Sequence, residues 1–277
     1  MNNNVTNRIH VAIRGTPYKS YGGSIPQNVR DLMDFLAKKY HFYDITFVTG
    51  RVYNIFMLAM DEHNRMLFIK SGRHPELYHN EYIMGRALWE MDHVHFLEPL
   101  YYSDKGKFFF FANEIMNGDS LQRLSDSGKL GTMSCDEKML LVRDLYQIFL
   151  ALKKSDVVHR DIRPENFAVI NGRLVLIDFQ LAVSKSCYRE LESMSVGRLR
   201  GLGTSKYRYK TWHWDDSYSL MKCLRFIGCP CKKYRPEYKQ IYREIKSYIG
   251  HDTIVSSKRE NSLTRLWRHL TKKHKKR

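Results

Sequence analysis

The chain has 277 residues, of which 43% are hydrophobic and 27% are charged, and its formal net charge is +17. This composition excludes a chain that is disordered along its whole length, and the length allows a substantial core in one large domain or two small lobes. Residues 232–277 hold 15 Lys and Arg against 4 Asp and Glu, a net charge of +11. A segment of that charge favours anionic partners, such as nucleic acid, acidic lipid or a phosphorylated glycan.

Signals for export or membrane insertion are not expected from this sequence. Its first six residues are polar and lead into no apolar stretch, which argues against a cleaved secretion signal. The apolar run 108–112 is far too short to span a bilayer. The five cysteines form no CxxC pair and their number is odd, so we expect free thiols. These features predict a cytoplasmic protein, or one held peripherally on the cytoplasmic membrane face.

The first part of the chain has the pattern of a small antiparallel sheet with one helix. Residues 1–40 form an N-terminal extension to which we assign no role, although 29–40 has a helical pattern. Runs rich in β-branched and aromatic residues, separated by polar turns, predict strands. Apolar positions at helical spacing predict a helix from Pro75, a favourable first helical residue, to about Met91. We expect a sheet lobe over 41–116, with strands at 43–49, 52–61, 66–70, 96–102 and 107–115.

The character of the sequence changes after a hinge near residues 114–118. An apolar face that recurs over 139–152 predicts a long helix. Two short strands, 167–170 and 174–177, are expected around an Asn-Gly turn. These features predict a second, mostly helical lobe over residues 117–256.

The last predicted unit is a basic amphipathic helix or tail over residues 257–277. Leu263, Leu266, Trp267 and Leu270 fall on one helical face, and basic residues surround them. Two interpretations remain open for this stripe. It lies on an anionic membrane surface, or it packs on the preceding lobe as the last core helix.

Two polar motifs in the second half carry the strongest functional signal. His159-Arg160-Asp161 is followed by Asn166, and a predicted buried strand leads into Asp178-Phe179. The first motif resembles the catalytic loop HRDxxxxN of protein kinases, and the second resembles the start of their DFG motif. The resemblance covers roughly residues 43–228. It implies an α+β, bilobal fold of the protein-kinase type.

The resemblance also implies a role for each polar residue of these motifs. Asp161 would accept the proton of the attacking hydroxyl, and Asn166 and Asp178 would ligate Mg²⁺, which prefers hard oxygen donors. Arg163 stands where related kinases carry a lysine that touches the γ-phosphate, and it supplies the same positive charge. Asp216 would be a structural anchor at the start of a buried helix.

A lysine at the end of a predicted strand completes the resemblance upstream. Phe68-Ile69-Lys70 is similar to the VAIK strand of protein kinases, which implies that Lys70 holds the α- and β-phosphates of ATP. Glu81, on the following helix, would be its ion-pair partner. Glu76 and Glu90 remain alternatives for that partner.

Other parts of the pattern depart from the family. Gly50 is the single glycine of the turn expected to cover ATP, where the family carries GxGxxG, and glycines let backbone N–H groups close on phosphates. Glu114 and Met116, at the hinge, complete the implied nucleotide-binding set. Gln180 replaces the glycine of DFG, which should restrict flipping of that loop. No Ala-Pro-Glu follows Tyr207, so the shelf that docks peptide substrates is shortened.

Taken as a whole, the resemblance implies an ATP- and Mg²⁺-dependent phosphotransferase with a hydroxyl acceptor. In its departures from the family pattern and in its basic tail, the sequence is loosely similar to bacterial kinases of lipopolysaccharide-core or other cell-envelope sugars. This similarity favours an envelope glycan as acceptor. A protein Ser/Thr kinase and a pseudokinase that acts as a binding module are the alternatives. No specific nucleic acid is expected as a partner, because the tail lacks a recognisable base-reading motif.

Overall fold

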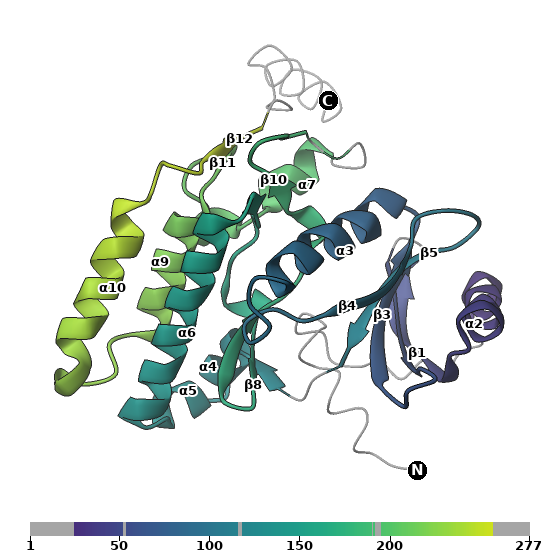
Figure 1. The fold of residues 1–277 in the computed structure, drawn as a ribbon, viewed down its shortest axis with the longest axis horizontal. Coiled ribbons are helices and arrows are strands. Elements are labelled where there is room, and N and C mark those ends of the chain that lie inside the picture. Colours follow the sequence, from purple (N-terminus) through teal and green to yellow (C-terminus); the bar gives the residue numbers. More distant parts are fainter. Residues whose placement is uncertain (1–24, 52–53, 116–117, 190, 192–194, 257–277) are drawn as a thin grey trace, which may run out of the picture.

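The computed structural model describes residues 25–51, 54–115, 118–189, 191 and 195–256. The described residues form an α+β fold of two lobes, with an antiparallel sheet in the N-terminal half and helices in the C-terminal half (Figure 1). This is the arrangement that the sequence predicts. The predicted N-terminal residues 1–24 and the basic segment 257–277 lie outside the described residues.

The sheet of the first lobe has the strand order β1-β2-β3-β5-β4, and every neighbouring pair is antiparallel. All five predicted strands are present. The fourth begins three residues later than predicted, because Phe96 instead makes a parallel bridge to Leu176 of the second lobe. The strands are β1 (Tyr43–Arg51), β2 (Asn54–Met60), β3 (Met66–Gly72), β4 (Pro99–Ser103) and β5 (Phe109–Glu114).

A helix from the predicted N-terminal extension covers one face of this sheet. It is α2 (Gln27–Tyr40), and its apolar positions Val29, Leu32 and Leu36 recur at helical spacing and are buried. They pack with alternate sheet residues such as Met57 on the same face. Burial of such side chains stabilises the folded state by roughly 2 kcal/mol each. The helix is therefore part of the core of the first lobe.

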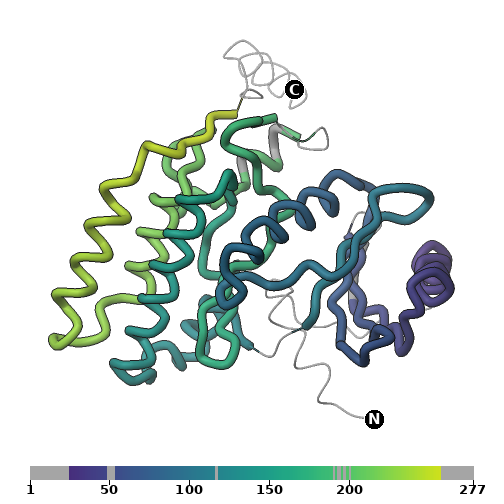
Figure 2. The backbone as a smooth tube through the Cα atoms, viewed as in Figure 1, coloured from purple at the N-terminus to yellow at the C-terminus, as the bar shows by residue number. Residues whose placement is uncertain are grey.

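The helix α3 (Pro75–Trp89) lies on the other side of the sheet, between the sheet and the helical lobe (Figure 2). Pro75 stands at its start, as predicted, where its missing N–H leaves no bond unmade. Leu88, near its end, joins the core of the second lobe. The helix thus contacts both lobes.

Three helices form the body of the second lobe and lie side by side (Figure 1). The longest, α6 (Cys135–Lys154), begins with a capping box in which Ser134 and Glu137 satisfy each other's backbone N–H groups. Its buried stripe packs on α9 (Asp216–Ile227) and α10 (Arg235–Ser247).

Short elements complete this lobe around the long helices. None of the short strands has enough residues for a periodic pattern. The helices are α4 (Leu121–Asp126), α5 (Lys129–Thr132), α7 (Val196–Gly201) and α8 (Thr204–Tyr207), and the strands are β6 (Gly118–Ser120), β7 (Val157–Val158), β8 (Phe167–Ile170), β9 (Arg173–Leu176), β10 (Val183–Ser184), β11 (His213–Trp214) and β12 (Ile254–Val255). Among the described residues, no helix has both the length and the apolar character needed to cross a membrane.

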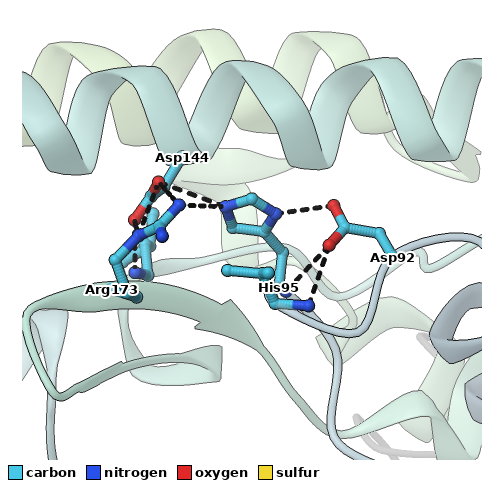
Figure 3. Close-up of polar contacts among 6 residues, drawn as sticks. Asp92, His95, Asp144 and Arg173 are labelled. Carbon is cyan, nitrogen blue, oxygen red and sulfur yellow. Dashed lines mark hydrogen bonds and ion pairs between the residues drawn. The ribbon is translucent and has the colours of Figure 1, made fainter.

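A buried charged cluster fixes the segment after α3 to the helical lobe (Figure 3). The His95 ring lies between two carboxylates, with Nδ1 2.6 Å from Asp92 Oδ2 and Nε2 3.1 Å from Asp144 Oδ1. Arg173 Nη2 donates to the same Asp144 oxygen at 2.7 Å. The backbone follows, because the N–H of Leu176 donates to the carbonyl of His95 at 3.0 Å. The loop between α3 and β4 is therefore held by both side chains and backbone.

Candidate active site

The predicted lysine on β3 lies between two carboxylates. Lys70 Nζ is 2.5 Å from Glu81 Oε1 and 3.1 Å from Asp178 Oδ1. Strand alternation places Lys70 on the same sheet face as Phe68, opposite the face covered by α2. The alternative partners are engaged elsewhere, since Glu90 pairs with Arg86 and Glu76 lies near His74. Glu81 is therefore the ion-pair partner of Lys70.

Burial gives this charged group unusual proton affinities. Burial alone lowers the pKa of Lys70, but the nearby charges of Asp178 and Glu81 outweigh it and the net pKa is raised. Burial raises the pKa of Glu81 to about 7, the Lys70 charge opposes that shift, and Asp178 adds to it. Lys70 is therefore a fixed positive charge, and Glu81 changes its ionisation near neutral pH.

The catalytic-loop residues lie on the segment between β7 and β8. Asp161 is buried, and its Oδ1 accepts a hydrogen bond from the N–H of Gly203 at 2.7 Å. Its Oδ2 accepts one from the side-chain amide of Asn166 at 3.1 Å. Arg163 Nε lies 3.6 Å from the same Oδ2. This brings together the base, the cation and one metal ligand that the resemblance implied.

Asp216 holds the backbone of the catalytic loop, which fits the anchor role that the family resemblance implied. Its Oδ2 accepts a hydrogen bond from the N–H of His159 at 2.6 Å and its Oδ1 accepts one from Arg160 at 3.1 Å. Arg160 has a left-handed backbone conformation, with φ of 65°, which needs such support. Burial raises the pKa of Asp216 to about 6, although the His159 and Arg160 groups oppose that shift.

The aspartate of the Asp-Phe-Gln segment is positioned by bonds on its N-terminal side and by an aromatic contact after it. The N–H of Ile177 donates to the carbonyl of Asn166 at 3.0 Å, which joins the two predicted metal-binding residues through the backbone. Asp178 itself has φ of 75°, a left-handed conformation that Asp tolerates better than most residues. Phe179 is buried, and its ring centroid lies 4.8 Å from that of His159.

Lys70, Glu81, Asn166 and Asp178 line a cavity between the lobes, whereas Asp161 and Arg163 are not part of its lining. Its empty volume, which includes space open to solvent, is about 610 Å³. Phe68 and Leu97 supply apolar walls, and Lys70, Glu81, Asn166 and Asp178 supply charged and polar ones. The lining residues are Phe68, Lys70, Glu81, Leu97, Asn113, Glu165, Asn166, Leu176, Ile177, Asp178 and Phe179.

Three other residues were predicted to bind the nucleotide, and of these only Glu114 can be compared with the lining. Glu114 ends β5 and does not line the cavity. Gly50 lies near the end of β1, where it pairs with Ile55 of β2. Met116 lies outside the described residues. The roles of all three remain predictions.

The donor set of the cavity suits Mg²⁺ bound together with phosphates. Within the described residues, no group of three or more His, Cys, Asp and Glu side chains could hold a metal ion alone. Mg²⁺ is commonly held by one or two protein oxygens, substrate phosphates and water. Asn166 uses its side-chain N–H group on the backbone and carboxylate oxygens of Asp161, so its amide oxygen is the atom left for a cation. Together with the Asp178 carboxylate, this matches the requirement.

Comparison with known proteins gives short, partial matches. No protein-family model matches the chain. The chain is similar to the meiosis-specific serine/threonine-protein kinase MEK1 of Saccharomyces cerevisiae, with 28% identity over 119 residues, or 41% of this chain and 24% of that protein. It is also similar to the probable serine/threonine-protein kinase ndrC of Dictyostelium discoideum, with 27% identity over 104 residues, or 37% of this chain and 8% of that protein. The matches therefore span less than two thirds of either relative.

These similarities support a protein-kinase-like superfamily for the chain. The two-lobed α+β fold is consistent with such a superfamily. Neither relative is a sugar kinase by name, so the predicted likeness to kinases of cell-envelope sugars gains no support.

Proposed function

We propose that the chain is an ATP- and Mg²⁺-dependent phosphotransferase that moves the γ-phosphate of ATP to a Ser or Thr hydroxyl of a protein. One observation carries the proposal: Lys70, Glu81, Asn166 and Asp178 line one cavity, and Asp161 is hydrogen-bonded to Asn166. Each residue type fits phosphoryl transfer, which needs little covalent chemistry and depends on positioning and on charge stabilisation.

The residues divide the work between the nucleotide and the acceptor. Lys70, which pairs with Glu81 and Asp178, would hold the α- and β-phosphates, and Asn166 and Asp178 would hold Mg²⁺. Mg²⁺, when bound with ATP, neutralises charge on the β- and γ-phosphates. Asp161 takes the proton of the acceptor hydroxyl. Arg163, beside it, stabilises the charge that develops on the transferred phosphoryl group.

The names of the two relatives favour a protein acceptor over the glycan that the departures from the family pattern suggested. Both are serine/threonine-protein kinases. A glycan acceptor rests on the basic tail and on the shortened segment after Tyr207, and the basic tail is equally compatible with an anionic protein.

The charge of the segment that contains Gly203, a backbone contact of Asp161, suggests that this protein acceptor is acidic. From residue 195 to residue 236 the sequence holds ten Lys and Arg, and its two acids, Asp215 and Asp216, are buried. The exposed Lys206 lies three residues after Gly203, whose N–H contacts Asp161. Carboxylates or phosphates near the acceptor hydroxyl would therefore meet positive charge.

Label transfer from γ-labelled ATP tests the reaction and its acceptor together. Wild-type chain and Asp161→Asn are incubated with a mixed protein extract, with synthetic acidic and basic Ser peptides, and with purified envelope glycan. We expect label on phosphoserine or phosphothreonine, more on acidic than on basic peptides, and none with Asp161→Asn. Asp126→Asn, an exposed change at the end of α4, is the matched control and should behave as wild type.

Two other results would overturn parts of the proposal. Label found only in the glycan would replace the protein acceptor by a sugar. No transfer to any acceptor, with no thermal shift on adding Mg²⁺-ATP, would identify the chain as a pseudokinase that acts as a binding module.

A further inference from the structure

The side chain of Asn80 reaches from α3 to the backbone of the Asp-Phe-Gln segment. Its amide nitrogen lies 3.2 Å from the carbonyl oxygen of Phe179, 3.1 Å from that of Gln180 and 2.8 Å from that of Ala182. All three neighbours are acceptors, so the group that faces them is the NH₂ end of the amide, whose two hydrogens are shared among three oxygens.

This contact is buried and joins distant parts of the chain. Asn80 is 9% exposed, and its partners lie about a hundred positions further along the sequence. All three belong to one short segment, the 3-10 turn Phe179–Leu181 and the residue that follows it. Carbonyls at such a turn have few partners within it, so a buried donor aimed at them stabilises this conformation over others.

Asn80 is the neighbour of Glu81 in the sequence, so one turn of α3 supplies two residues that restrain Asp178. Glu81 binds Lys70, and Lys70 binds Asp178 through its carboxylate. Asn80 binds the backbone that begins one residue after Asp178. The metal-binding aspartate is thus held to α3 both by its side chain and by the chain that follows it.

A glycine on α3 allows this close approach. A Cβ at Gly85 would lie 3.2 Å from Pro99 Cγ and 4.0 Å from the Phe179 ring. The first distance is tighter than an ordinary contact, so a side chain at position 85 would require Pro99 or α3 to shift by a few tenths of an ångström. The helix and the Asp-Phe-Gln turn therefore pack as one unit.

We propose that Asn80 is a positioning residue that holds Asp178 in its metal-facing arrangement in the nucleotide-free chain. A change of this turn that carried Asp178 out of the cavity would have to break the three contacts of Asn80 and the Lys70–Asp178 ion pair together. The chain therefore assembles its metal site before ATP binds. This role rests on the proposed function for its catalytic consequence, but the fixing of the turn is independent of catalysis.

Two substitutions remove the donor in different ways. Asn80→Asp keeps the shape and replaces the NH₂ group by an oxygen, and Asn80→Leu removes the donor without adding charge. Asn171→Asp, in the exposed turn between β8 and β9, is the matched control. Each protein is full length and is compared with wild type by hydrogen–deuterium exchange without nucleotide, by thermal unfolding, and by Mg²⁺ titration of ATP turnover.

Both Asn80 variants should exchange faster than wild type at the amides of residues 178–183, while the helices α6 and α9 keep their protection. Their Mg²⁺ concentration for half-maximal turnover should rise roughly tenfold, as expected for the loss of one or two buried hydrogen bonds. Asn171→Asp should match wild type in both measurements.

The outcomes separate this role from a merely structural one and from the proposed reaction. Unchanged exchange at residues 178–183 in both variants would overturn the proposal. So would a lower melting temperature with an unchanged Mg²⁺ midpoint, because that pattern belongs to a residue that only stabilises the fold. If wild type shows no turnover, the proposed function fails, and faster exchange in the variants still supports the fixing of the turn.

Discussion

Two charge clusters built on buried side chains join the lobes of this protein, and they differ in charge balance and in access. In the Lys70 cluster, one cation faces the carboxylates of Glu81 and Asp178, and the group borders a cavity. In the His95 cluster, His95 and Arg173 face the carboxylates of Asp92 and Asp144. Full ionisation therefore leaves the first cluster with one excess negative charge and the second with none.

The His95 ring contacts both carboxylates of its cluster and the guanidinium of Arg173. Both ring nitrogens lie within 3.1 Å of a carboxylate oxygen, and Nε2 also lies 3.3 Å from Arg173 Nη2 (Figure 3). Burial lowers the pKa of His95, but its hydrogen bonds with Asp144 and Asp92 outweigh that effect and raise the net pKa. When fully ionised, the His95 cluster has no net charge and needs no further ion. The Lys70 cluster keeps one excess negative charge, so it is suited to bind a further cation. Matched changes in the two clusters can test this contrast.

The largest expected effect is on activity, from removing a carboxylate of the Lys70 cluster. Asp178→Asn keeps the shape of the side chain and removes a ligand of Mg²⁺, so turnover of ATP should fall by about a thousandfold. The remaining Lys70–Glu81 pair is neutral, so the melting temperature should stay the same or rise. A fall in melting temperature with retained turnover would assign Asp178 a structural role instead.

The matching change in the His95 cluster should act on stability. Asp144→Asn leaves His95 and Arg173 without the buried carboxylate that both contact, and the free energy of unfolding should fall by about 3 kcal/mol. Denaturant unfolding measures this change. Turnover per folded molecule should stay within about threefold of wild type, because the cluster does not border the cavity. A thousandfold loss of turnover in folded Asp144→Asn would contradict the separation of the two clusters.

The next effect is a pH dependence that belongs to Glu81. Its pKa in the folded chain is about 7, so Glu81 gains a proton as the pH falls through 7 and no longer pairs with Lys70 as a carboxylate. kcat/KM for ATP should therefore fall as the pH drops below 7, by about tenfold per pH unit where this ionisation limits the rate. In Glu81→Gln this dependence should be absent and the rate at pH 8 reduced.

The stability contribution of the same group has the opposite sign. The folded pKa of Glu81 is raised above its ordinary value of 4.5. Its contribution to folding is therefore largest below pH 4.5 and is lost as the pH rises through 7. Unfolding measured between pH 5 and pH 8 should show a smaller decline for Glu81→Gln than for wild type. Equal declines would show that another group titrates.

The smallest expected effect concerns a salt bridge outside both clusters. Arg143 and Glu237 join α6 to α10 with a distance of 2.7 Å, and both side chains are well exposed. Glu237→Gln should change the free energy of unfolding by less than about 1 kcal/mol, because water and salt screen such a pair. A loss of free energy as large as that of Asp144→Asn would mean that burial does not explain why the His95 cluster is more stabilising than this exposed pair.

Local sequence patterns predict much of this fold because its elements obey them. The strands of the first lobe and the helix α6 have periodic apolar residues, and the observed bounds differ from the predicted ones by a few residues. The start of β4 is the instructive exception. Phe96 has the apolar character of a strand residue, but the His95 cluster draws this segment to the other lobe, where it pairs with Leu176.

The parts that the sequence could not supply depend on contacts between distant residues. His95 and Asp144 are 49 positions apart, and Asn80 and Ala182 are 102 apart, so no local period relates them. The helix over 29–40 was predicted, but its place on the sheet was not, because an amphipathic pattern does not say which surface it covers. For Lys70 and Glu81 the family resemblance supplied what the spacing alone left open.

The most direct test is the effect of Mg²⁺ on ATP affinity in wild type and in Asp178→Asn, measured by calorimetric titration at equal ionic strength. Wild type should bind ATP at least about tenfold more tightly with Mg²⁺ than without it, because the cation neutralises the excess negative charge of the Lys70 cluster. Asp178→Asn should gain little from Mg²⁺. Equal affinities with and without Mg²⁺ in wild type would contradict the assignment of this cluster as a Mg²⁺-ATP site.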